Sequence, residues 1–211
     1  MADKERMSDA GKRRIAGTMD PLSTFKKIQE VVASGVGVAE GMETVLAFCE
    51  KARPHADWSV LSKLPYGNLS ELRSWLVRVF EHEPPPQKIV GLWFGLFNPV
   101  VDGVVVCDLH LCGSERFSAD PGDKSWAVGP EWRPTERNAG SRILTALYLV
   151  AHRDGGLGND AEYALALAYA ALAVSEVLRA ETSFPRLKET VGVAVGFDSG
   201  DFLTLGSLGE A

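Results

Sequence analysis

The feature of this sequence that most constrains the fold is a nearly uninterrupted apolar segment toward its C-terminal end. The longest apolar run extends from Tyr163 to Val174. A helix needs about twenty apolar residues to cross a bilayer, so this run is too short to span one. A helix that is apolar on nearly all sides must then be surrounded by the rest of the fold. We therefore predict a buried central helix over residues 160–180, with Asn159 or Asp160 as its N-cap.

The N-terminal part of the chain predicts amphipathic helices. Asp20 and Pro21 supply a cap and a first-turn proline, and apolar residues then recur at helical spacing. Two more stripes of this kind follow, and the last one stops at Pro84. Residues 19–83 are thus expected to form a helical part. The charged, aperiodic residues 1–18 are expected to be a disordered tail.

Short apolar or alternating segments in the remaining chain predict β-strands separated by turn residues. The expected strands are about 88–97, 103–112, 191–197 and 201–205. A further helix is expected near residues 143–151, so two central helices lie between the two predicted hairpins. We therefore predict a single α+β domain over 19–211. Its helical part packs with a sheet-and-helix part, 88–208, whose sheet is antiparallel and built from two hairpins.

The net charge limits the class of partner. The chain carries −6 at pH 7 with a pI near 5.3. Nine Asp and Glu against three Lys and Arg lie in residues 154–211, so the whole excess is there. Duplex affinity comes largely from basic side chains that neutralise phosphates, so this balance argues against a nucleic-acid partner. The acidic segment either solvates the surface or steers a cationic partner.

The cysteines and the N-terminus indicate a compartment. Cys49, Cys107 and Cys112 are an odd, scattered set, and the charged N-terminus has no secretory apolar region. We expect a reduced, cytoplasmic protein with no membrane association. The sequence lacks the GxSxG motif of hydrolases, the HExxH and CxxC motifs, the EF-hand calcium loop and the glycine-rich motifs that bind nucleotide phosphates. We therefore expect no cofactor.

One strand carries residues with catalytic or metal-binding chemistry. Asp108, His110 and Cys112 alternate along it and would share one face. Carboxylate, imidazole and thiol are all zinc ligands, and a thiol beside an imidazole is a minimal nucleophile. Neighbours on one strand reach a common metal less readily than residues from separate elements do. The alternative is a polar face that is covered by the following loop or open to water.

The long segment 113–137 shows no periodicity and contains Trp126, Trp132 and Arg133. Tryptophan and arginine are over-represented at binding hot spots, because they bury much area and still satisfy polar neighbours. Buried aromatic side chains equally anchor a loop to its own domain. These residues are therefore candidates for partner binding, with self-packing as the alternative.

The acidic segment offers four further candidates for partner binding. Asp160 and Glu162 open the central helix, and Asp198 and Asp201 flank the turn of the second hairpin. Capping is the simpler explanation of the first pair, and solvation of a hairpin tip is the simpler explanation of the second. Glu162 could also lie close to His152 or Arg142 across the helix pair, although the spacing does not demand it.

The order of these segments resembles that of a known group. GLWFGLFNP, DLHLCGSERF, GPEWRPTER, GLGNDAEYALALAYAALAV and VGFDSGDF follow one another within residues 91–205. As a set they resemble a group of uncharacterised bacterial proteins associated with immunity proteins that are encoded beside polymorphic toxins. The resemblance does not include residues 19–87, and it assigns no functional residue.

Two functions compete on these grounds. The first is a non-catalytic, immunity- or antitoxin-like protein that neutralises a basic toxin domain by direct binding. The second is a small zinc- or thiol-dependent enzyme that uses Asp108, His110 and Cys112. The missing catalytic motifs, the acidic segment and the resemblance favour the first. The sequence leaves the oligomeric state open.

Overall fold

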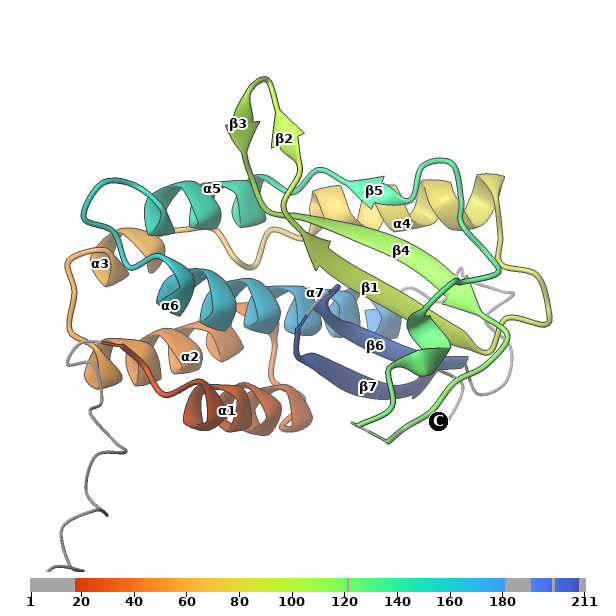
Figure 1. Cartoon of the computed structure of the whole chain (residues 1–211), viewed down its shortest axis with the longest axis horizontal. Coiled ribbons are helices and arrows are strands. Elements are labelled where there is room, and N and C mark those ends of the chain that lie inside the picture. The colour runs from red at the N-terminus through yellow and green to blue at the C-terminus, as the bar shows by residue number, and fades with distance from the viewer. Residues whose placement is uncertain (1–17, 121, 181–190, 199, 209–211) are drawn as a thin grey trace, which may run out of the picture.

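The fold was analysed in a computed structural model that describes residues 18–120, 122–180, 191–198 and 200–208. The helices are α1 Pro21–Ala33, α2 Val38–Ala52, α3 Trp58–Leu61, α4 Ser70–His82, α5 Arg142–Ala151, α6 Asn159–Ala161 and α7 Leu167–Ala180, with a 3-10 turn η1 Ser125–Ala127 and a π-helical segment η2 Glu162–Ala166. The strands are β1 Gly91–Phe97, β2 Val100–Val101, β3 Val104–Val105, β4 Asp108–Ser114, β5 Asn138–Ala139, β6 Val191–Phe197 and β7 Phe202–Leu208 (Figure 1). The chain is thus α+β, as the sequence predicts.

Five strands form one mixed sheet in the order β5-β4-β1-β6-β7. The β1–β4 and β6–β7 pairs are antiparallel, which confirms the pairing inside each predicted hairpin. β1 and β6 pair in parallel, so the expectation of a wholly antiparallel sheet is wrong. The reason is the connection: helices α5 to α7 carry the chain across the sheet, and such a crossover brings the next strand back parallel.

The predicted central helix is confirmed, and it forms the centre of the core. Residues Asn159–Ala180 make one helix of 22 residues, which is long and apolar enough in composition to cross a membrane. Of its most apolar stretch, however, 78% is buried inside this protein. Its last segment, α7, contacts α1, α2, α4, β6 and β7. In Figure 1 it runs behind the strands and between the N-terminal helices. The helix therefore packs on one face of the sheet and on the helical part together.

The first helix, α1, begins as its sequence predicts. The carboxylate of Asp20 accepts a hydrogen bond of 3.1 Å from the backbone N–H of Ser23, which caps α1. Residues 1–17 of the expected tail lie outside the described residues. The short helix α3 was not expected. Asp57 at its start is buried, pairs with Arg153, and accepts a 3.2 Å hydrogen bond from Leu157 N. It thereby holds the loop that leads into the central helix.

The first hairpin is interrupted by a smaller one. β2 and β3 pair only with each other and project from the edge of the molecule (Figure 1). The turn residue Asp102 has φ 51° and Gly103 has φ 81°, the left-handed conformations that an Asp-Gly turn requires. The four valines of this hairpin are exposed. The predicted strand 103–112 is therefore two strands, β3 and β4.

The second face of the sheet carries a row of small residues. On β1 and β6 this row pairs Gly91 with Gly192 and Gly95 with Gly196. Between them, the one large residue, Trp93, pairs with Ala194. Side chains of the segment after β4 fill the space that these positions leave, with Trp126 against Gly91 and Phe117 against Gly192. Helices thus cover one face, and this segment lies in front of the other (Figure 1).

Gly95 is a position in this row where no larger side chain fits without displacing its neighbours. A methyl group there would overlap His110 Nε2 and Asp198 Oδ1, whereas nothing lies within 4 Å of the same group at Gly140. We expect Gly95→Ala to lower the free energy of unfolding by about 1–3 kcal/mol, because a methyl group forced into packed surroundings displaces side chains. Urea denaturation, with Gly140→Ala as the matched control, measures it. Equal stability of the two variants would contradict this packing.

Candidate functional site

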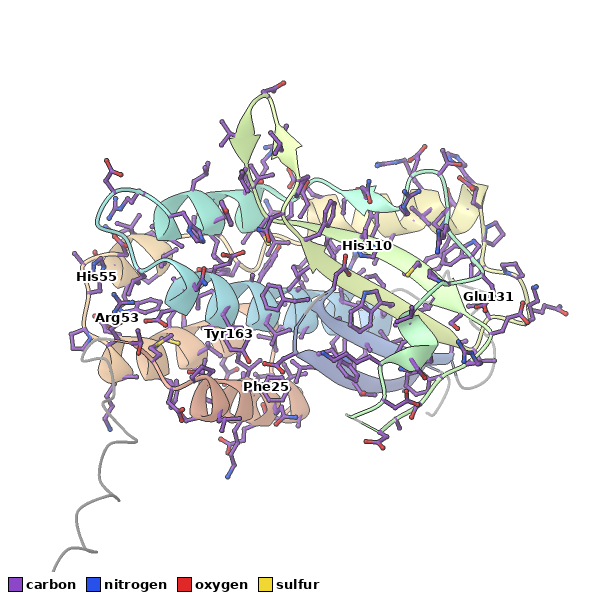
Figure 2. The ribbon with its side chains drawn as sticks, viewed as in Figure 1. Phe25, Arg53, His55, His110, Glu131 and Tyr163 are labelled. Atoms are coloured by element: carbon purple, nitrogen blue, oxygen red, sulfur yellow. The ribbon has the colours of Figure 1, made fainter. Side chains whose placement is uncertain are left out.

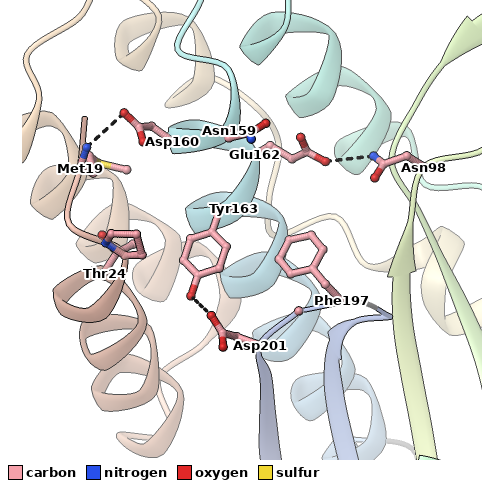
Figure 3. A pocket seen from close by; sticks show the side chains of 11 residues that line it. Met19, Thr24, Asn98, Asn159, Asp160, Glu162, Tyr163, Phe197 and Asp201 are labelled. Atoms are coloured by element: carbon pink, nitrogen blue, oxygen red, sulfur yellow. Dashed lines mark hydrogen bonds between the residues drawn. The ribbon is translucent and has the colours of Figure 1, made fainter. Parts of the chain in front are cut away.

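Two pockets lie on opposite sides of the β6–β7 turn. The larger, about 500 Å³, is bordered by the start of α1, the start of the central helix and the turn itself. We call it the acidic cleft, because Asp160, Glu162 and Asp201 all line it (Figure 3). The second, about 320 Å³, lies on the sheet face away from the helices and includes His110 and Asp198. We call it the sheet-face pocket.

Glu162 reaches the acidic cleft from the π-helical segment. Its carboxylate accepts hydrogen bonds of 3.0 Å from the Asn98 amide and 2.6 Å from His152 Nε2. The contact with His152 is one that the sequence left open. A π-helical turn widens the helix locally, and such segments often occur at functional sites. Here η2 covers Glu162–Ala166, so the side chains of Glu162 and Tyr163 project into the acidic cleft from this wider turn.

Tyr163 connects the central helix to the turn of the second hairpin. Its hydroxyl donates a 2.7 Å hydrogen bond to Asp201, and its ring stacks on Phe197 with centroids 5.9 Å apart (Figure 3). Burial, followed by the bond to Asp201 and its charge, raises the pKa of the Tyr163 hydroxyl well above its ordinary value. The hydroxyl therefore stays protonated and donates to Asp201 throughout the physiological range.

Neither Asn159 nor Asp160 caps the central helix, so the predicted N-cap is wrong. Gly158 occupies the N-cap position, and no side chain makes a capping bond. Asp160 instead pairs with Arg53 at 2.5 Å and accepts a 3.2 Å hydrogen bond from Met19 N. The carboxylate thus connects α2 and the start of α1 to the central helix, and Arg53 neutralises it.

Two other carboxylates of the acidic cleft accept hydrogen bonds from neutral donors. Glu162 is bonded to the neutral amide of Asn98 and to His152, and Asp201 to the neutral hydroxyl of Tyr163. A neutral donor satisfies a carboxylate without cancelling its charge. The cleft thus combines two carboxylates with the stacked rings of Tyr163 and Phe197.

The sheet-face pocket is organised around Asp198. Its carboxylate accepts a 2.9 Å hydrogen bond from His110 Nε2 and a 3.2 Å bond from the indole of Trp93. Partial burial acts to raise the pKa of Asp198, but the hydrogen bond and charge of His110 and the Trp93 donor outweigh it and lower that pKa. Asp198 and Asp201 therefore line different pockets.

The three strand residues with catalytic chemistry are used separately. Asp108 accepts a 3.2 Å hydrogen bond from Ser141 N at the start of α5, and His110 is bonded to Asp198. Cys112 is buried, and this burial raises the pKa of its thiol to about 12. Among the described residues, no three His, Cys, Asp or Glu side chains gather as a metal site. Figure 2 shows His110 on β4, in front of the central helix that carries Tyr163.

The two tryptophans of the long segment are anchors within the domain. Trp126 is 2% exposed and packs edge-on against Trp93, while Trp132 is 7% exposed and stacks on Phe80. Self-packing, the alternative that the sequence left open, describes both indole rings. Arg133 is different, because its side chain is exposed and lines the sheet-face pocket.

Sequence reasoning missed several residues of both pockets. Asn98 lines the acidic cleft and Arg53 pairs with its Asp160, both from distant parts of the chain, and Lys124 lines the sheet-face pocket. Tyr163 was overlooked because it is the first residue of the apolar run. A tyrosine at the start of a buried helix nevertheless indicates a hydroxyl that needs a hydrogen-bond partner.

Comparison with known proteins adds no relative. No family model, no curated protein and no solved structure matches this chain.

The environment of Cys112 makes its reactivity testable. Burial raises the pKa of Cys112 and of Cys49 to about 12, so both thiols are protonated at pH 8. Because the thiolate is the reactive form, we expect iodoacetamide to modify both slowly in the folded protein and quickly in urea. Mass spectrometry of the alkylated peptides measures the rates. Rapid modification of Cys112 alone in the native protein would favour the thiol enzyme instead.

The lowered pKa of Asp198 predicts a pH-dependent stability. A carboxyl whose folded pKa lies below its ordinary value of 3.8 stabilises the fold above that pH. The contribution is lost as pH falls through the folded value. We expect Asp198→Asn to be less stable than wild type at pH 6, with the difference shrinking toward pH 3. Urea denaturation across this range measures it.

The matched control for this experiment is Asp154→Asn, at an exposed carboxylate for which no hydrogen bond appears in the described part of the chain. A constant difference between wild type and Asp198→Asn at all pH values would show that the Asp198 charge does not contribute.

Proposed function

We propose that this chain is a non-catalytic binding protein, of the immunity or antitoxin kind, that neutralises a basic toxin domain by direct contact. The observation that carries the proposal is the acidic cleft. Three of the four acidic residues that the sequence singled out, Asp160, Glu162 and Asp201, line one concave site of about 500 Å³. A partner whose basic side chains enter this cleft would meet carboxylates that are already held in place.

The cleft suits an arginine side chain of such a partner. A guanidinium group is planar, binds carboxylates through paired hydrogen bonds and stacks on aromatic rings. Glu162 and Asp201 would supply the carboxylates, and the stacked pair of Tyr163 and Phe197 would supply the rings. Toxins that act on nucleic acids need basic surfaces, so an acidic inhibitor can occupy the same surface and associate rapidly.

The proposal includes a reducing, cytoplasmic location. Cys49, Cys107 and Cys112 are all free and buried. Disulfides are rare where thiols are kept reduced, so free cysteines fit such a compartment.

The thiol-based enzyme has less support. The pKa of Cys112 is raised to about 12 by burial, and the imidazole of His110 is bonded to Asp198. A nucleophilic cysteine needs a lowered pKa and an adjacent base.

The proposal is tested by isothermal titration calorimetry with the basic toxin domain that an immunity protein predicts to be encoded beside it. We expect Glu162→Gln/Asp201→Asn to weaken binding about tenfold or more, because charge pairs across an interface are lost while each new side chain keeps an acceptor oxygen. The charge-matched control is Glu43→Gln/Glu50→Gln on α2, where both side chains are exposed. It is expected to bind within about twofold of wild type.

Growth of cells that express this toxin gives an independent measurement. Wild type and the α2 control should restore growth, and the cleft variant should restore it poorly. If the cleft variant binds and protects as well as wild type, the acidic cleft is not the binding surface.

A further inference from the structure

The sheet-face pocket gathers cationic side chains in an otherwise acidic protein. Lys124, Arg133 and Arg137 all line it, beside His110. The whole chain carries a net charge of −6. A local excess of positive charge on such a protein has a cost in repulsion among the cations, so it calls for an explanation.

The backbone fixes the arginines at the pocket's rim. Trp132 pairs with Gly113 of β4 through two backbone hydrogen bonds of 2.9 and 3.0 Å, and Arg137 O accepts a 2.9 Å bond from Leu111 N. Arg133 and Arg137 thus lie at the two ends of a short loop segment that is hydrogen-bonded to β4 on either side. Their positions relative to the strand do not depend on their own side chains.

The cations are not used in ion pairs within the described part of the chain. The neighbouring carboxylates have other partners: Glu131 accepts from Glu115 N, and Glu136 pairs with Arg78. Asp198 is held by His110 and Trp93. Among the described residues, no carboxylate lies within 4.0 Å of the charged nitrogens of Lys124, Arg133 or Arg137.

Apart from Asp198, whose carboxylate is held by His110 and Trp93, the rest of the lining is apolar. Trp93 and Cys112 come from the sheet, and Ala127, Val128 and Pro130 from the segment in front of it. Small-molecule sites typically pair an apolar lining with a few placed polar groups, and about 320 Å³ is at the lower end of their volumes. The pocket therefore fits a small molecule with an apolar body and an anionic end.

We propose that the sheet-face pocket binds a small organic acid. Its carboxylate or phosphate group lies between Arg133, Arg137 and Lys124, and its apolar part lies against Trp93 and the segment around Val128. This site is independent of the acidic cleft and goes beyond the binding of a toxin, because the two pockets have opposite charge and lie on opposite sides of the β6–β7 turn.

The full chain without partner is titrated with benzoate, phenyl phosphate and the uncharged benzamide, by calorimetry and by tryptophan fluorescence, since Trp93 lines the pocket. We expect both anions to bind saturably and benzamide to bind at least about tenfold more weakly, because only the anions gain charge-assisted hydrogen bonds. Added salt should weaken the anions and leave benzamide unchanged.

Variants locate the site. Arg133→Gln/Arg137→Gln is expected to weaken phenyl phosphate at least about tenfold. The charge-matched control Lys63→Gln/Arg73→Gln, at exposed positions of the N-terminal part, should bind as wild type does. Circular dichroism and urea denaturation verify that both variants are folded. Equal binding of benzamide and benzoate, no saturable binding of either anion, or equal affinity in the two double variants would each overturn the proposal. A loss of toxin binding in the cleft variants would leave it unaffected.

Discussion

The structure depends on burying a helix that has no polar side of its own. From Leu165 to Val174, every residue of the helix is at most 5% exposed, so this stretch cannot lie on a surface. Each fully buried aliphatic side chain contributes about 1.5–3 kcal/mol relative to exposure. The N-terminal helices and the sheet therefore have to enclose it from different directions. The helix reaches solvent near its two ends, and Glu162 and Tyr163 lie at the first of them.

The same requirement determines where the pockets are. Since the helices occupy one face of the sheet, the long segment after β4 has only the other face on which to pack, and Trp126 and Phe117 attach it to the small residues of β1 and β6. The β6–β7 turn then separates the space beside the central helix from the space beside the long segment. Asp201 faces the first and Asp198 the second. Two carboxylates three positions apart thus belong to chemically different environments.

Local sequence patterns predicted those features of the fold that depend on interactions between residues close together in the chain. The Asp20 cap, the central helix and the pairing inside both hairpins follow from spacing and turn residues alone. The parallel pairing of β1 with β6 could not be predicted, because a buried strand is apolar whichever way its neighbour runs. The partner of Asp160 could not be predicted either. Arg53 is more than a hundred positions away, and only the packing of α2 on the central helix brings the two side chains together.

The pairing of β1 with β6 has a consequence for how the chain acquires its fold. The two central strands are separated by about a hundred residues, and loop closure over such a distance costs entropy before any contact compensates it. During synthesis β1 and β4 emerge long before β6 and β7. The apolar edge of β1 that β6 will cover is therefore open to other chains until the last strands leave the ribosome. We therefore expect folding to await the hairpin of β6 and β7, and a nascent chain that pauses before it to be especially exposed to aggregation.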